Sequence, residues 1–281
     1  MSAPIEHGLY IVATPIGNLG DLSRRAEEIL SAADLVLVED SRVTGKLLNH
    51  IEKKKKMVVY NDHKGERERH EILAAMGCKI VALVSDAGTP LISDPGYKLV
   101  RDAQAAGIHV TTVPGPSAVI AALTLSGLPS DRFLFEGFLP SKTKARGEVL
   151  AELKPVKATL IFYENGSRLG AMLADALNIL GDREVAVIRE ITKKFEETVT
   201  GSLIMLADRY ASEKPKGEIV VVIGPPGAAE PASSEDIEAA LRLALERLPA
   251  AKAAGEVARA FGADRKMLYD LANRWKAERQ K

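Results

Sequence analysis

The sequence predicts two consecutive α/β domains followed by a small helical module. The chain has 281 residues, about the length of two average domains. Short apolar runs alternate with helical patterns through residues 8–126, as in a mostly parallel sheet with covering helices. This pattern restarts near residues 127–131, and residues 224–231 have the Pro/Gly composition of a linker. We expect domains at residues 1–127 and 128–226 and a helical module at residues 234–281.

Five apolar runs of the first domain have the length and composition of buried strands. They are residues 8–13, 35–38, 57–60, 79–84 and 108–113. Ser23 is placed to cap a helix that ends near Ala33. Further helices are expected at residues 65–76, 97–106 and 118–126.

The second domain and the tail continue the strand and helix patterns. Strand-like runs occur at residues 133–138, 158–163, 185–189 and 218–223, with helices at 144–153 and 168–180. This domain is expected to have more antiparallel character than the first. Three helices are predicted after the linker, at residues 234–248, 251–261 and 264–275.

Composition and charge exclude several classes of protein. Hydrophobic residues make up 46% of the chain and charged residues 27%, which is typical of a globular protein. A single cysteine, Cys78, excludes a disulfide framework and a cysteine-based zinc site, and it suits a reducing cytoplasm. No signal peptide or membrane span is recognisable. Basic and acidic residues both number 38, but residues 250–281 contain 8 basic against 4 acidic residues. A basic end on a neutral protein often contacts a polyanion.

Common catalytic and nucleotide-binding motifs are missing. No G-x-G-x-x-G follows the first strand, and Gly45-Lys46 lacks the upstream glycine of a P-loop. Neither H-E-x-x-H nor G-x-S-x-G occurs, and the five histidines show no spacing of metal ligands.

Three loops rich in Gly and Pro follow predicted parallel strands, at residues 14–21, 85–96 and 114–117. Ligands of open α/β sheets bind at the carboxyl ends of the strands. Each loop alone is more typical of an ordinary turn. Together, at one edge of one sheet, they favour a ligand site.

These loops also carry a specific resemblance. The matching segments are residues 13–21, 38–42, 85–96, 113–118, 137–140, 189–197 and 216–218. In order along the whole chain, they resemble the small-subunit ribosomal RNA cytidine 2′-O-methyltransferase I family, which has the tetrapyrrole-methylase fold. The sequence departs from the family pattern at two places. Residues 165–168 are Asn-Gly-Ser-Arg, where the family has Ser-Pro-His-Arg, and residue 41 is serine, where threonine is usual.

The resemblance implies S-adenosylmethionine bound in a cleft between the two α/β domains, a homodimer and no metal. It places Pro15 beneath the cofactor and the segment from Gly217 to Ile219 near its adenine. The residues that it places around the rest of the cofactor are Asp86, Ala87, Gly88, Thr89, Ile92, Ser117, Ala118 and Tyr163. Residue type alone favours simple core packing for Tyr163 and Ile219, because apolar strand residues are usually in the core.

Methyl transfer to a ribose hydroxyl needs in-line positioning and is helped by a base, because the hydroxyl is a weak nucleophile until it loses its proton. Glu39, Asp40, Glu190 and Lys193 end strands and are candidates. Asp40, oriented by Arg42, is the preferred base. The alternative, that Asp40 and Arg42 form a structural ion pair at a helix start, is equally consistent with the sequence.

Basic residues near the second domain and in the tail are candidate RNA contacts. They are Lys142, Lys144 and Arg146, then Lys193 and Lys194 beside Phe195, and finally Arg265 and Lys266. The last two would open the second helix of a helix-turn-helix whose turn contains Gly262. A generic three-helix cap is the alternative.

These observations predict a cytoplasmic methyltransferase that uses S-adenosylmethionine to methylate a cytidine ribose in small-subunit ribosomal RNA, free or in the assembled subunit. Two other hypotheses are a tetrapyrrole methyltransferase of the same fold and a non-catalytic RNA-binding assembly factor. The basic tail argues against the former, and cofactor binding would separate the latter.

Overall fold

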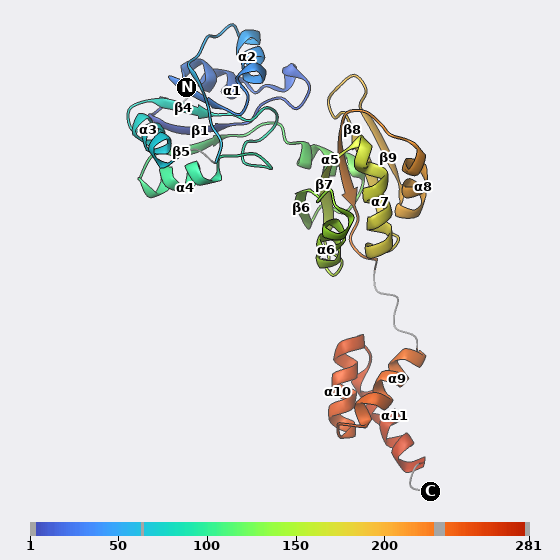
Figure 1. Ribbon diagram of the computed structural model, residues 1–281. Helices are drawn as coiled ribbons and strands as arrows, with labels where there is room; N and C mark the ends of the chain where they lie inside the picture. The colour runs from blue at the N-terminus through green and yellow to red at the C-terminus, as the bar shows by residue number, and fades with distance from the viewer. Residues whose placement is uncertain (1–3, 63–64, 228–233, 279–281) are drawn as a thin grey trace. The chain divides into compact units, whose positions relative to one another are not determined.

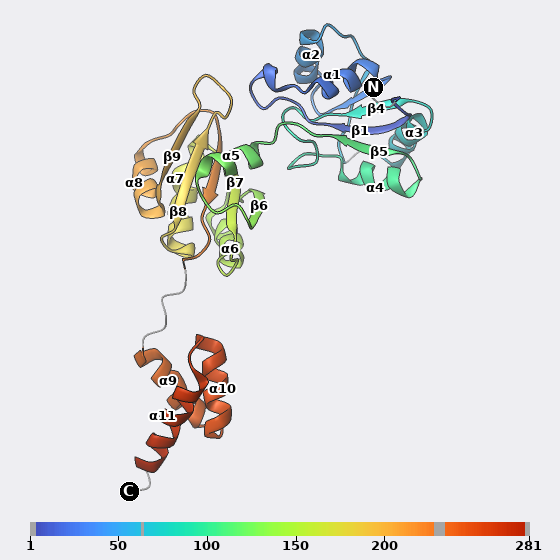
Figure 2. The same cartoon turned by 180° about the vertical axis from the view of Figure 1, so that it is seen from behind.

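The computed structural model describes residues 4–62, 65–227 and 234–278 (Figures 1 and 2). It contains two compact units, residues 1–225 with both sheets and residues 226–281 with the three C-terminal helices. Residues 228–231 of the predicted linker lie outside the described residues, as do Arg279 and Lys281 of the basic tail.

The first sheet is parallel throughout, in agreement with the sequence prediction. Its strands are β1 (Gly8–Val12), β2 (Leu35–Val38), β3 (Met57–Val59), β4 (Ile80–Leu83) and β5 (Val110–Val113), in the order β3-β2-β4-β1-β5. Because β4, β1 and β5 are neighbours, the loops that follow them meet at the same edge of the sheet.

Helices cover both faces of this sheet. Helices α1 (Arg24–Ala32) and α2 (Ser41–His50) pack on the face that carries Tyr10, whereas α3 (Glu66–Met76) and α4 (Tyr97–Ala105) pack on the face that carries Leu9. Successive side chains of a strand point to opposite faces, so a sheet covered on both sides needs strands that are apolar throughout. This explains why the strands read as unbroken apolar runs in the sequence.

The second sheet is mixed. Its strands are β6 (Phe133–Phe138), β7 (Thr159–Asn165), β8 (Glu184–Arg189), β9 (Glu197–Ser202) and β10 (Glu218–Ile223), in the order β6-β7-β10-β8-β9. Strands β6 and β7 run parallel, and the other pairs are antiparallel. The expected antiparallel character is therefore confirmed.

One face of the second sheet is covered by α6 (Thr143–Leu153), α7 (Gly166–Leu180) and α8 (Leu203–Ser212). The sequence interpretation missed β9 and α8. Strand β9 lies at the sheet edge and is largely exposed, so it lacks the apolar run that marks the other strands.

Helix α5 (Ala118–Ser126) packs on the opposite face of the second sheet. Its Val119, Ala122 and Leu123 share a buried cluster with Ile188 of β8 and Val220 of β10. The sequence places this helix in the first domain, but its apolar surface is buried against the second. The boundary at residue 127 stays a prediction; the helix before it belongs by packing to the following sheet.

The C-terminal unit has a small core of its own. Helices α9 (Ser234–Leu245), α10 (Ala250–Phe261) and α11 (Arg265–Glu278) enclose Leu241, Ala253, Ala254, Val257 and Leu268. Gly262 ends α10 with φ +65°, a conformation that glycine adopts without strain. None of the described helices is both long and apolar enough to cross a membrane.

Candidate functional site

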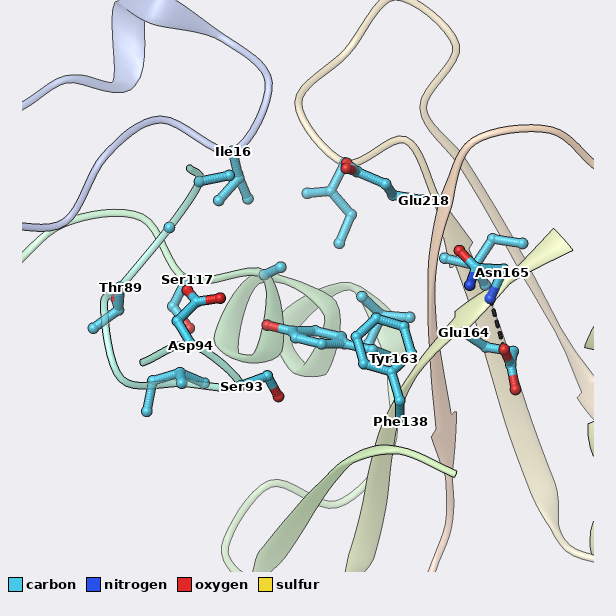
Figure 3. A pocket seen from close by; sticks show the side chains of 17 residues that line it. Ile16, Thr89, Ser93, Asp94, Ser117, Phe138, Tyr163, Glu164, Asn165 and Glu218 are labelled. Atoms are coloured by element: carbon cyan, nitrogen blue, oxygen red, sulfur yellow. Dashed lines mark hydrogen bonds between the residues drawn. The ribbon is translucent and has the colours of Figure 1, made fainter. Parts of the chain in front are cut away.

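A pocket lies where the strand-end loops of the first sheet face β6, β7 and β10 of the second sheet (Figure 3). It holds about 910 Å³ of empty space, part of it open to solvent. Its lining consists of Ile16, Ala87, Gly88, Thr89, Ile92, Ser93, Asp94, Ser117, Ala118, Phe138, Tyr163, Glu164, Asn165, Ile191, Glu218, Ile219 and Val220.

The first wall of the pocket is the loop at residues 85–96, and backbone hydrogen bonds hold its start. Thr14 N–H donates to the Gly88 carbonyl at 2.8 Å, and Gly88 N–H donates to the Thr14 carbonyl at 3.0 Å. The Thr89 hydroxyl donates to the Pro116 carbonyl at 3.0 Å, joining this loop to the loop after β5. The three strand-end loops are thus cross-linked into one wall.

Gly88 has φ +78°, and a Cβ at this position would lie 3.2 Å from Cγ2 of Ile16. Both the backbone conformation and the close approach of Ile16 therefore favour glycine. A side chain here would also enter the pocket that Gly88 lines.

The end of the same loop is anchored too. Gly96 N–H donates to a carboxylate oxygen of Asp62 at 3.1 Å. Leu91 and Ser93 adopt left-handed backbone conformations, with φ +75° and +65°. Such conformations cost about 1–3 kcal/mol each for side-chain-bearing residues and are found mainly where the surroundings enforce them.

The second wall consists of strand side chains. The Tyr163 ring lies 4.8 Å from the Phe135 ring and 5.5 Å from the Phe138 ring. Phe138 is 54% exposed although it is a large apolar side chain. The Phe138 and Tyr163 rings, with Ile219 and Val220 of β10, form an apolar surface suited to a flat ligand.

The charge of the lining is negative. Asp94, Glu164 and Glu218 are acidic, and no Lys or Arg occurs among the described residues that line the pocket. Burial, reinforced by the carboxylate of Glu39, raises the pKa of Asp94 to about 6. Burial also raises the pKa of Tyr163 to about 12, with smaller contributions from Asp94 and Glu218. The pocket therefore favours a cationic ligand over a phosphate.

The N-terminus of α5 also borders the pocket. Ser117 precedes the helix and makes no side-chain capping hydrogen bond, and both Ser117 and Ala118 are lining residues. Uncapped N–H groups at a helix start attract carboxylates. One part of the site thus suits a positive group and another a carboxylate.

The structure brings most residues of the expected cofactor site together. Those in the lining are Ala87, Gly88, Thr89, Ile92, Ser117, Ala118, Tyr163 and Ile219. Pro15, Asp86 and Gly217 are not in the lining, but each directly precedes a residue that is. Asp86 accepts a hydrogen bond from Asp40 N–H at 3.0 Å, which ties the loop after β4 to the loop after β2.

Sequence reasoning missed several lining residues. They are Ile16, Ser93, Asp94, Phe138, Glu164, Asn165, Ile191 and Val220. Most lie in the segments that carry the family resemblance, but nothing in their residue type distinguished them from turn or core positions. Asn165 belongs to the departure at residues 165–168.

Asp40 and Arg42 form a structural ion pair at the start of α2, as the alternative interpretation expects. Asp40 caps the helix by accepting Arg42 N–H at 2.8 Å, and it pairs with the Arg42 guanidinium at 2.6 Å. The side-chain hydrogen bond from Arg42 lowers the pKa of Asp40 to about 2. Neither residue lines the pocket, and the assignment of Asp40 as base and of Arg42 as its orienter stays a prediction.

Glu190 forms hydrogen bonds at one end of the second sheet. Its Oε1 accepts the Glu218 N–H at 3.0 Å and Lys193 Nζ at 2.9 Å, and Lys193 also pairs with Glu218 at 2.7 Å. The hydrogen bond from Lys193 is the main reason that the pKa of Glu190 is lowered. A Cβ on Gly217 would lie 2.5 Å from the same oxygen. Glu190 lies outside the lining and is held by these hydrogen bonds, and its catalytic role stays a prediction.

The predicted RNA contacts divide into buried and exposed groups. Arg146 corrects the prediction: its side chain is 5% exposed and pairs with Asp175 at 2.6 Å, and it also donates to the Ser141 carbonyl at 3.2 Å. Arg146 is buried because its guanidinium on α6 pairs with the carboxylate of Asp175 on the neighbouring helix α7. Lys142 and Lys144 are exposed.

The remaining basic candidates also differ in their surroundings. Lys193 is engaged by two carboxylates, whereas Lys194 is exposed and lies 5.6 Å from the ring centre of Phe195, itself 63% exposed. In the C-terminal unit, Arg265 and Lys266 are exposed at the start of α11. The Asp264 side chain caps this helix by accepting Lys266 N–H at 2.7 Å.

Comparison with known proteins identifies the class of this fold and site. The family model for tetrapyrrole (corrin/porphyrin) methylases matches residues 8–207. A solved structure with the same fold is uroporphyrin-III C-methyltransferase from Thermus thermophilus, complexed with S-adenyl homocysteine. It is 21% identical, with a TM-score of 0.52, and the match covers 77% of this chain and 97% of the other. The expected tetrapyrrole-methylase fold is confirmed.

Closer relatives identify the family within this class. Ribosomal RNA small subunit methyltransferase I of Erythrobacter litoralis is 56% identical over 96% of this chain and 95% of its own. The protein of the same name from Mesorhizobium japonicum is 50% identical over 95% of this chain and 91% of its own. A second family model, the RsmI C-terminal HTH domain, matches residues 231–276. The chain belongs to the ribosomal RNA small subunit methyltransferase I family.

Proposed function

We propose that this protein methylates small-subunit ribosomal RNA, transferring the methyl group of S-adenosylmethionine to the ribose 2′-hydroxyl of a cytidine. The observation that carries the proposal is the identity of 50% and 56%, over nearly the full length, to relatives named ribosomal RNA small subunit methyltransferase I. The fold alone would not distinguish RNA from a tetrapyrrole as substrate.

The pocket fits the proposed methyl donor. S-adenosylmethionine supplies a methyl group activated by a positively charged sulfonium, and it also carries an ammonium, a carboxylate and an adenine ring. The acidic lining suits the positive groups, and the uncapped start of α5 suits the carboxylate. Phe138, Tyr163 and Ile219 offer the apolar surface that an adenine ring needs.

The chain itself contributes binding and orientation. We assign donor binding to the lining residues that the resemblance named, with Pro15, Asp86 and Gly217 shaping the loops beside them. Positioning the donor methyl within about 3–3.5 Å of the attacking oxygen is a major source of catalysis in group transfer. The cross-linked loops provide this rigidity, since Gly88 and Thr89 are both held by hydrogen bonds.

Exposed cations are the proposed RNA contacts. We assign this role to Lys142 and Lys144 at the start of α6, to Lys194 with Phe195, and to Arg265 and Lys266. Lysine and arginine bind phosphates, and an exposed aromatic ring stacks on an unpaired base. Lys193 instead orders the loop before Lys194 through its two ion pairs.

The assembly and location belong to the same proposal. We expect a homodimer, as the family resemblance implies, in the cytoplasm, where the single Cys78 stays reduced. We also propose that the assembled small ribosomal subunit is a substrate. Analytical ultracentrifugation of the purified protein tests the dimer.

Methyl transfer from radiolabelled S-adenosylmethionine tests the function directly. Small ribosomal subunits and naked ribosomal RNA, each from cells lacking this enzyme, are the two substrates. We expect incorporation at one cytidine, seen as a single gap in an alkaline hydrolysis ladder, because cleavage needs the free 2′-hydroxyl. Incorporation into neither RNA, with intact donor binding, would contradict the proposal and favour a non-catalytic role.

A further inference from the structure

We propose that the carboxylate of Asp94 is the general base of this protein, accepting the proton of the ribose hydroxyl that attacks the methyl group. The inference rests on the proposed function and deepens it. It differs from the predicted bases Asp40 and Glu190, which pair with Arg42 and Lys193 and lie outside the pocket lining. It assigns the chemical step to a loop that the sequence marked only as a ligand loop.

The position of Asp94 in the pocket is the first argument. Asp94 lines the pocket from the loop wall, and Figure 3 shows the hydroxyl of Tyr163 directed from the strand wall toward the side of the pocket on which Asp94 lies. The carboxylate of Asp94 also contributes to the raised pKa of Tyr163, after burial. A ligand between the loop wall and the strand wall would therefore meet this carboxylate.

Asp94 also differs from the other acidic lining residues. Glu164 pairs with Arg168 at 3.3 Å, and Glu218 pairs with Lys193 at 2.7 Å. Among the ion pairs formed by described residues, none includes Asp94. Burial raises the pKa of Glu164 although Arg168 pairs with it, but its side chain is only 1% exposed. Asp94 is therefore the lining carboxylate that combines access to the pocket with the absence of an ion pair.

The loop fixes Asp94 in place. Leu91 and Ser93 lie in left-handed conformations before it, and Gly96 after it is bonded to Asp62. A Cβ on Gly96 would lie 2.9 Å from Leu83, so the chain turns tightly against the end of β4. Backbone strain of this kind is typical of loops that orient a functional side chain.

The protonation state suits a base. Burial and the negative charges of Glu39 and Asp86 raise the pKa of Asp94 to about 6, although a hydrogen bond from the Ser85 side chain lowers it in part. Tyr163 faces it from β7 and stays protonated, since its own pKa is raised to about 12. At neutral pH, Asp94 is thus ionised but more basic than an ordinary aspartate, close to the optimum for a general base.

The step balances in atoms and charge. The 2′ oxygen forms a bond to the methyl carbon while the bond between that carbon and the donor sulfur breaks. The electron pair of the broken bond stays on the sulfur, which becomes a neutral thioether. The hydroxyl proton moves to a carboxylate oxygen of Asp94 and passes to water when the products leave.

The test compares Asp94→Asn with the control Asp208→Asn, an exposed aspartate on α8 outside the pocket. We expect kcat for methyl transfer to fall about 10²- to 10⁴-fold in Asp94→Asn, with the Kd for S-adenosylhomocysteine, measured by calorimetry, within about threefold of the unmodified protein. Asp94→Ser should give the same loss of kcat. The control should match the unmodified protein in both measurements.

Two pH measurements sharpen the result. For the unmodified protein, kcat/KM for the methyl donor should fall tenfold per pH unit below about pH 6, and Asp94→Asn should lose this limb. Because ionisation of a carboxyl with a raised pKa disfavours the folded state, Asp94→Asn should melt at a higher temperature than the unmodified protein above pH 6. This difference should vanish as the pH falls toward the ordinary aspartate pKa of 3.8.

Two outcomes overturn the inference alone. A turnover of Asp94→Asn within threefold of the unmodified protein excludes a base. A Kd for S-adenosylhomocysteine weakened tenfold or more, with full kcat at saturating donor, makes Asp94 a donor ligand instead. Absence of methyl transfer by the unmodified protein, with its donor binding intact, overturns the proposed function and the base assignment together.

Discussion

The two walls of the pocket are built in different ways. The loop wall depends on backbone positions: Thr14 and Gly88 exchange hydrogen bonds, and Leu91 and Ser93 hold left-handed conformations. The strand wall depends on side chains such as Tyr163, whose backbone is part of a continuous sheet. A change of backbone preference should therefore damage the first wall most, and a change of side-chain size the second. Mutations in each wall test this difference.

Gly88→Val in the loop wall should have the largest effect on the site. A β-branched side chain is strained at φ +78°, would crowd Ile16 and would enter the pocket. We expect the affinity for S-adenosylmethionine, measured by calorimetry, to fall more than about 100-fold, equivalent to about 3 kcal/mol.

The matched control for this change is Gly107→Val. Gly107 has φ +69°, but a Cβ there meets nothing within 4 Å, and it lies outside the pocket. The control carries the same kind of backbone strain, so it should lower the melting temperature while donor affinity is kept. Unmodified affinity in folded Gly88→Val protein would remove this loop from the donor site.

Arg146→Ala should be the most destabilising change behind the strand wall. It leaves the Asp175 carboxylate, 18% exposed, without the guanidinium 2.6 Å away. Removing one member of a buried pair costs about 3–5 kcal/mol, which urea unfolding would measure. The control is Arg67→Ala, whose exposed ion pair with Glu71 should contribute less than about 1 kcal/mol. Equal losses for the two variants would show that the Arg146 pair is not a structural element.

Tyr163→Ala should weaken donor binding by about 10- to 100-fold, because it removes the ring that packs against Phe135 and Phe138. Tyr163→Phe keeps the ring and should stay within about threefold of the unmodified affinity. If Tyr163→Phe were as weak as Tyr163→Ala, the hydroxyl rather than the ring would be the contribution of the strand wall. Calorimetry with S-adenosylhomocysteine measures both.

The double variant Lys142→Ala/Lys144→Ala tests the surface outside both walls. Hydrogen bonds to charged groups contribute about 1 kcal/mol or more each, so RNA affinity should fall about 10- to 100-fold while donor affinity is unchanged. Lys53→Ala/Lys54→Ala, which removes two exposed lysines of the run at residues 53–56, is the matched control. Filter binding at two salt concentrations separates the two variants, and equal affinities at both would exclude Lys142 and Lys144 as contacts.

Truncation after Ser233 should have the smallest effect on the pocket. The C-terminal unit has its own buried cluster and is a separate compact unit, so donor affinity should be unchanged. RNA affinity should weaken. The slope of log affinity against log salt concentration should decrease in magnitude by about three, because about three fewer phosphate contacts would release counterions. An unchanged salt slope would make the three helices a structural cap.

The sequence by itself determined the buried strands, the order of the domains and the ligand edge of the first sheet. Strands buried on both faces must be apolar throughout, so β1, β2 and β4 were recognisable from their side chains alone. Strand β9 was missed because an exposed edge strand carries no such signal. The family and its donor followed from the loop segments, whose Gly and Pro residues are tied to local backbone shape.

Tertiary structure decided the roles of the charged residues. Asp40, Glu190 and Asp94 are all carboxylates at strand ends or in loops, and the sequence could not rank them as bases. Packing places Arg42 on Asp40 and Lys193 on Glu190, whereas Asp94 is left half-buried in the pocket. The physical reason is that the basicity and accessibility of a charged side chain depend on burial and on partners distant in the chain. Arg146 is a further example, since its buried ion pair with Asp175 on another helix keeps its guanidinium from the surface.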